Sequence, residues 1–237
     1  MRFAAPKSSR DEASAQVAHH IETRGQHVHL VHPTSVPGWG HTIGLSAELG
    51  YELVLAGAAY YSTDEVMHVL NGVAASVRAG ATEPFEVEAL GNFTLGTCDA
   101  AWSEQLLTRA ATHYRSTLIS ARQVIPDTEH WTLDTPDLSQ AFTTSAAPAW
   151  RWLVEPWALP VPESAHVATS LDILRGAPAT HVARFEADTY EAFSDEPPDD
   201  AAVRVVPISV MLAADPRMQV LLGLELGAEL DLDAPRR

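Results

Sequence analysis

The chain has 237 residues, of which 46% are hydrophobic and 19% charged, so it can bury a sizeable core in one large or two small domains. Its formal net charge of −16 at pH 7 opposes the neutralisation of phosphates on which nucleic-acid binding depends, and it disfavours anionic membranes for the same reason. The single cysteine, Cys98, excludes a disulfide within the chain and a thiolate-rich metal site.

Targeting signals are not recognised in the sequence. No apolar run approaches the ~20 residues that a bilayer-spanning helix needs. The N-terminal stretch has basic residues but lacks the apolar core of a secretory signal. We therefore expect a cytoplasmic protein with no nucleic-acid and no membrane partner.

Hydrophobic periodicity predicts a first domain over residues 16–142, preceded by a flexible N-terminus at 1–15. Strands alternate apolar and polar residues, whereas helices repeat apolar residues every three or four positions. The predicted elements, in chain order, are a helix at 15–25, strands at 27–33, 40–45 and 51–57, a helix at 63–80, strands at 84–90 and 92–98, a helix at 100–118 and a strand at 119–127.

A change in composition marks the end of this domain. Four prolines between residues 143 and 164 disfavour a helix or a long strand, so this segment is predicted to be a linker rich in proline and tryptophan. Beyond it, residues 165–237 again mix short strand and helix patterns. The predicted fold class is therefore α+β, with two small domains that each pack a mainly antiparallel sheet against one or two helices.

Four short motifs in the first domain resemble those of an uncharacterised bacterial family, the domain of unknown function numbered 4262. They are TIGL (42–45), GYELV (50–54), LNG (70–72) and QVIPD (123–127). The resemblance covers about residues 16–142 and implies no known reaction or cofactor. The chain departs from the family pattern at His41, where the family has another aromatic residue, and at Tyr51-Glu52, where it has His-Pro.

The second domain, at about 165–235, has a weaker resemblance to a small α+β domain found among bacterial immunity proteins, which act by binding a toxin. Three stretches carry this similarity: YEAFS (190–194), VRVVPISVMLAADPRM (203–218) and LLGLELGAE (221–229). The resemblance implies a protein partner.

Histidines on the predicted hairpin at 27–45 suggest a candidate site. His27 and His29 are two positions apart, so they share one face of a strand, and His41 joins them if the two strands pair. Trp39 and Thr42 lie beside them. Because no H-E-x-x-H motif is present, we expect no cofactor or metal; the alternative is zinc or iron bound by His27, His29 and His41.

Other catalytic motifs are absent from the sequence. No G-x-S-x-G elbow supports a serine hydrolase, and the G-x-G of residues 38–40 is not followed by the helix of a dinucleotide-binding fold. Whether the protein is an enzyme stays open at this point, as does its oligomeric state.

A candidate interface lies in the second half of the chain. Tryptophan is favoured at interface hot spots, and acidic residues suit a basic partner. The candidate residues are Trp150, Trp152, Trp157, Asp195, Glu196, Asp199 and Asp200.

The sequence therefore favours an acidic protein-binding module, one form of which would neutralise a basic partner as an immunity protein does. The alternative is an enzyme, or a protein that binds a small molecule or metal, with its site on the 27–45 hairpin.

Overall fold

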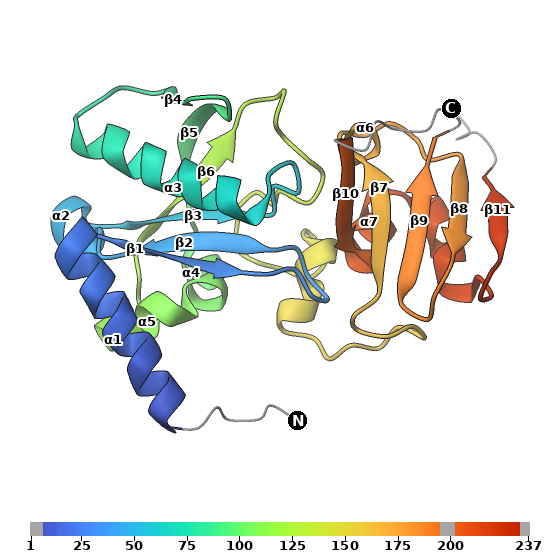
Figure 1. Ribbon diagram of the computed structural model, residues 1–237, viewed down its shortest axis with the longest axis horizontal. Coiled ribbons are helices and arrows are strands. Elements are labelled where there is room, and N and C mark those ends of the chain that lie inside the picture. Colours follow the sequence, from blue (N-terminus) through green and yellow to red (C-terminus); the bar gives the residue numbers. More distant parts are fainter. Residues whose placement is uncertain (1–6, 195–201, 233–237) are drawn as a thin grey trace.

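A computed structural model describes residues 7–194 and 202–232, which form two β-sheets side by side (Figure 1). The first half of the chain contains a six-stranded sheet and the second half a five-stranded one. Helices pack against both sheets, which confirms the predicted α+β class with two sheet-based units.

The first sheet has the strand order β1-β2-β3-β6-β5-β4, in which β3 and β6 are parallel and the other neighbours antiparallel. The crossover between β3 and β6 contains a helix, a hairpin and two further helices. The elements are α1 (Lys7–Arg24), β1 (His27–Val31), β2 (Trp39–Ile43), α2 (Ser46–Leu49), β3 (Glu52–Ala56), α3 (Thr63–Arg78), β4 (Phe85–Val87), β5 (Gly91–Thr97), α4 (Ala100–Leu106), α5 (Thr108–Tyr114) and β6 (Ala121–Pro126).

Strand β3 shows that this sheet is covered on both faces, since all of its residues are buried. Successive side chains of a strand point to opposite faces. Leu53 and Leu55 accordingly pack in the core under α3, whereas Val54 and Ala56 pack in the core on the side of α4 and α5. Figure 1 shows α3 on one side of the sheet and α1, α4 and α5 on the other.

The sequence places helix α3 well because local signals and tertiary packing agree. Ser62 is the N-cap and forms a capping box with Glu65, which satisfies free N–H groups of the first turn. Val66, Leu70 and Val73 recur at helical spacing and are buried against the sheet.

Three other segments differ from their predicted extents. α1 begins at Lys7, within the region expected to be flexible. The helix predicted at 100–118 is divided into α4 and α5, because Leu107 departs from helical geometry with φ −100° and ψ 30°. Within the predicted linker, residues Pro148–Leu153 form the short 3-10 helix η1, which begins with a proline because the first helical turn does not use that N–H.

The second sheet has the order β10-β7-β9-β8-β11, in which β7 and β9 are parallel and the other neighbours antiparallel. Helical segments that follow β10 pack on one face, where Val167, Tyr190 and Met211 are buried. The elements are β7 (His166–Ser170), α6 (Leu171–Leu174), β8 (His181–Arg184), β9 (Thr189–Phe193), β10 (Val203–Pro207), α7 (Ile208–Ala214), η3 (Pro216–Gly223) and β11 (Glu229–Asp231).

Tryptophans join the two units through one continuous core. Trp150 of η1 is 2% exposed and packs between two tryptophans of the first unit, with ring centroids 6.1 Å from Trp39 and 5.8 Å from Trp102. Its indole N–H donates a hydrogen bond of 3.0 Å to the carbonyl of Asp134. The buried apolar residues of α4 and α5 thereby contact those of the second sheet without a break.

Candidate functional site

The β1–β2 hairpin does bring the three predicted histidines to one face of the first sheet. His29 lies directly opposite His41 in the strand register. Their ring centroids are 5.3 Å apart, and those of His27 and His29 are 6.4 Å apart. His20 of α1, which is not one of the predicted site residues, extends the row because its Nδ1 lies 2.9 Å from Nδ1 of His27.

Burial favours the neutral forms of His27, His29 and His41. Loss of solvent lowers the pKa of His41 to about 3, and the same cause, with the nearby His20, lowers the pKa of His27 to about 4. Nδ1 of His41 hydrogen-bonds the Thr42 carbonyl at 3.1 Å, but its buried Nε2 has no partner among the described residues. Residues 7–194 and 202–232 contain no group of three or more His, Cys, Asp or Glu side chains placed to hold a metal ion.

Thr42 and Trp39 do not join the histidines. The hydroxyl of Thr42 donates to Glu52 at 2.7 Å and accepts from the N–H of Leu53 at 2.8 Å, so it links β2 to β3. The indole of Trp39 donates to the Leu106 carbonyl at 2.9 Å. Both side chains therefore make structural contacts away from the histidine row.

Glu52 is a buried carboxylate with a structural role. It lies at the start of β3, is fully buried, and organises the turn that follows β2. Such a charge is tolerated only when donors surround it. Its donors are the hydroxyls of Thr42, Ser46 and Tyr114 and the backbone N–H groups of Gly44, Leu45 and Ser46, at 2.5 to 3.3 Å.

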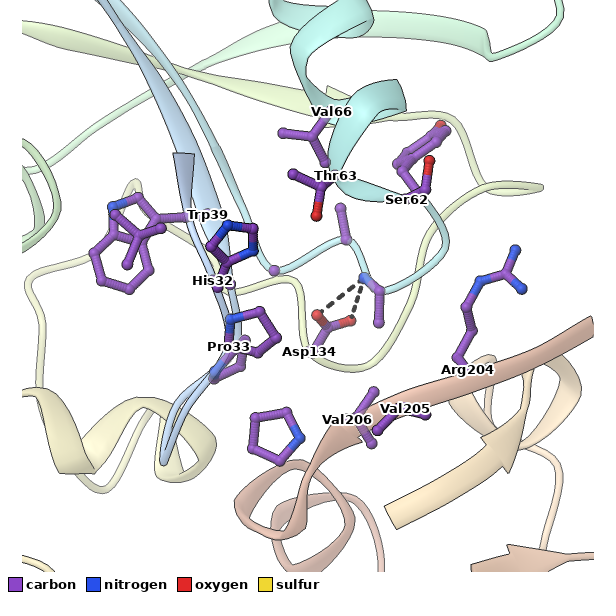
Figure 2. A pocket seen from close by; sticks show the side chains of 18 of the residues that line it. His32, Pro33, Trp39, Ser62, Thr63, Val66, Asp134, Arg204, Val205 and Val206 are labelled. Carbon is purple, nitrogen blue, oxygen red and sulfur yellow. Dashed lines mark hydrogen bonds between the residues drawn. The ribbon is translucent and has the colours of Figure 1, made fainter. Parts of the chain in front are cut away.

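A cavity of about 200 Å³ lies between the two units (Figure 2). One wall comes from the β1–β2 hairpin, at residues 30–33 and 37–39, and another from the start of α3. Strand β10 closes the opposite side with Val205 and Val206. Most of these lining groups are apolar or aromatic, with Asp134 as the carboxylate and Arg204 as the guanidinium among them. Arg204 donates hydrogen bonds to the carbonyls of Tyr60 and Val203, at 3.0 and 2.9 Å, and forms no ion pair with Asp134.

Asp134 is a second buried carboxylate, and its surroundings differ from those of Glu52. It is 3% exposed, and it accepts the backbone N–H of Ala59 at 3.1 Å to Oδ2 and 3.3 Å to Oδ1 (Figure 2). No Arg, Lys or His of the described ranges forms an ion pair with it. Burial is the largest cause of its altered acidity and raises its pKa to about 6.

The backbone after β3 is shaped to reach Asp134. Gly57 and Ala58 both have positive φ, of 72° and 66°. A Cβ on Gly57 would lie 2.3 Å from the carbonyl oxygen of Asp134, so only glycine permits this approach. Positive φ is uncommon for alanine and costs free energy, and such strain clusters at functional sites.

An open groove adjoins the cavity and shares Pro33, Val205, Val206 and Pro207 with it. The groove has a volume of about 600 Å³. Glu163 lines it and accepts a hydrogen bond of 3.0 Å from Ser35 of the hairpin loop.

The cavity uses the predicted 27–45 hairpin, but of the candidate residues only Trp39 lines it. Asp134 was missed because it lies in an irregular segment, with no motif around it. The one available signal is its apolar neighbour Leu133, which is insufficient to predict burial.

The candidate interface residues differ in how far they are buried, and some of them lie outside the described residues. Trp150 is buried in the core and is not available to a partner. Trp152 and Trp157 are half-buried against each other, with centroids 4.8 Å apart. The acidic candidates lie outside the described residues: Asp195, Glu196, Asp199 and Asp200.

Comparison with known proteins finds a family similarity in the first unit. Residues 20–132 match the family described as "Domain of unknown function (DUF4262)", which confirms the resemblance seen in the sequence motifs. The match ends before Asp134 and before the second sheet, whose similarity to immunity proteins stays a prediction. No curated protein and no solved structure matches the chain. None of the helices in the described ranges is both long and apolar enough to cross a membrane.

Proposed function

We propose that the protein is a binding protein that holds an organic ammonium group in the cavity between its two sheets. The observation that carries this proposal is the Asp134 carboxylate, which lines an apolar cavity without a cationic partner among the described residues. A buried carboxylate is costly unless it is paired, so a ligand cation would relieve this cost.

The surrounding groups favour an alkylammonium over other cations. An ammonium supplies three N–H donors, and a carboxylate accepts at about four lone-pair sites, so Asp134 can take donors in addition to the Ala59 N–H. The walls near it include Leu30, Trp39 and Val66, which suit an alkyl chain. This proposal develops the alternative of a small-molecule site on the 27–45 hairpin.

Calorimetric titration with n-butylammonium chloride at pH 7.5 tests the proposal. We expect saturable binding that is at least tenfold weaker for Asp134→Asn and unchanged for Asp137→Asn, which alters an exposed acid nearby. The neutral analogue n-butanol should bind at least tenfold more weakly than the cation. Equal affinities for the two compounds would reject the carboxylate as the basis of recognition.

A second candidate function is the binding of a basic protein partner, of which immunity-type neutralisation is one form. The net charge of −16 and the exposed Glu163 in the open groove favour it. Capture from extracts of the native host should then return a basic protein at low salt. The captured protein should be lost with Glu163→Lys and kept with Glu129→Lys, an exposed acid away from the groove.

A further inference from the structure

Strand β10 is an edge strand whose outer side faces the groove. Ile208 N–H bonds the carbonyl of Ala165, and hydrogen-bonded pairs alternate along an antiparallel ladder. Val206 and Arg204 therefore direct their backbone groups toward β7. The backbone N–H and C=O of Val205 point the other way, away from the sheet.

The hydrogen bonds between β7 and β9 confirm which residues of β10 face β7 and which face outward. His166 N–H bonds the carbonyl of Asp188 before β9, so the even-numbered residues of β7 bond β9. The odd-numbered residues Val167 and Thr169 are left to bond β10, where they lie opposite Val206 and Arg204. Val205 is 59% exposed and lines both the cavity and the groove.

The volumes of the cavity and of the open groove suit a ligand that places one side chain in the cavity and its main chain in the groove. The cavity of about 200 Å³ is smaller than the ~300–1,000 Å³ of typical small-molecule pockets. The open groove beside it, at about 600 Å³, has room for main chain. Val205 and Pro207 belong to both spaces, so a segment lying along β10 has the cavity beside it.

We propose that an extended segment of a basic protein adds to the outer edge of β10 and inserts a lysine side chain into the cavity, above Asp134. This inference rests on the proposed ammonium site and names the source of the ammonium. Edge-strand addition supplies affinity through main-chain hydrogen bonds, and pockets for alternate side chains supply specificity.

Charge and shape favour lysine as the inserted residue. Asp134 lies at the cavity and Glu163 along the groove, so each space presents a carboxylate to the segment. Arg204 also lines the cavity, but its guanidinium donates to the carbonyls of Tyr60 and Val203 and forms no ion pair with Asp134. Lysine carries a compact charge on a flexible apolar stem, which fits a narrow apolar passage better than the planar fork of arginine.

Fluorescence anisotropy with the labelled peptide acetyl-Thr-Val-Lys-Val-Thr-amide tests the inference at pH 7.5. We expect it to bind at least tenfold more tightly than n-butylammonium. Replacement of its lysine by norleucine, and N-methylation of its two valine amides, should each weaken binding at least fivefold. The first change removes the charge, and the second removes edge hydrogen bonds.

Protein variants separate the edge from the ammonium site. Val205→Pro removes the outward N–H without removing a bond to β7, and should weaken the peptide at least fivefold more than it weakens n-butylammonium. Val205→Ala also alters this cavity-lining side chain but keeps the N–H, so it should change the affinities for the two probes by the same factor. If Val205→Pro fails to fold, the N-methylated peptide on the unaltered protein decides. A peptide no tighter than n-butylammonium overturns the inference and leaves the ammonium site standing, whereas binding of neither probe overturns both.

Discussion

At the scale of single residues, the two buried carboxylates have opposite effects on the stability of the fold. Glu52 is surrounded by hydroxyl and N–H donors and stabilises the turn after β2. Asp134 receives the Ala59 N–H and has a pKa raised by burial, so its ionised form opposes folding. Residues that weaken a fold are commonly kept for binding, which agrees with the role proposed for Asp134.

The Asp134→Asn variant should be more stable than the parent protein above pH 6. The folded-state pKa of Asp134 is about 6 and its ordinary value is 3.8. Between these values the unfolded chain releases the proton first, so rising pH costs the folded protein up to about 3 kcal/mol. Urea denaturation at pH 4 and pH 7.5 measures the effect. The two proteins should differ little at pH 4, and equal stability at pH 7.5 would contradict the prediction.

At the scale of elements, the histidine row makes the docking of β1 and β2 sensitive to acid. His41 is fully buried with a folded-state pKa of about 3, whereas the unfolded value is 6.5. As the pH falls below 6.5, the unfolded chain binds a proton that the folded protein does not. From pH 7 to pH 5 this removes about 2 kcal/mol of stability.

Replacing His41 by Phe should reduce this acid sensitivity, because the variant has no proton to bind at that position. Thermal unfolding between pH 5 and pH 7 measures it, with His68→Asn on the exposed face of α3 as the control. The control should keep the full pH dependence. A His41→Phe variant whose pH dependence equals that of the parent protein would show that other groups cause the acid sensitivity.

The connection after β3 should tolerate no side chain at Gly57. An added Cβ meets the backbone of Asp134 at 2.3 Å and 2.7 Å, so Gly57→Ala should cost about 3 kcal/mol or more. Gly50→Ala is a matched control, since Gly50 also has positive φ, of 81°, but has open space around it. It should lose only the conformational cost of about 1–2 kcal/mol. Urea titration of both variants measures the difference, and equal losses would show that the clash is relieved.

At the scale of the whole molecule, the shared core predicts that the two units unfold together. Trp150 contacts Trp39 and Trp102 and is almost fully buried, so Trp150→Ala should cost about 3–5 kcal/mol. Circular dichroism and tryptophan fluorescence should report one coincident transition for the parent protein and two separated ones for the variant. Two transitions in the parent protein would show that the units are energetically independent.

The sequence predicted best those parts in which local pattern and tertiary burial coincide. Helix α3 has a clear apolar period and strand β3 a continuous apolar run, and the shared face of His27 and His29 follows from strand alternation. The start of α1 was missed because its residues lack an apolar stripe. Asp134 became a candidate site only through the contacts that surround it in the fold, which residue spacing does not encode.

The placement of Trp150 has a consequence for any fragment of this protein. Trp39 and Trp102 belong to the segment that matches the family, whereas the indole that covers them comes from outside it. Truncating the chain after residue 142 would expose a hydrophobic patch on the N-terminal fragment, which would then tend to aggregate. A working boundary for recombinant fragments therefore lies beyond η1, even though the recognisable motifs end well before it.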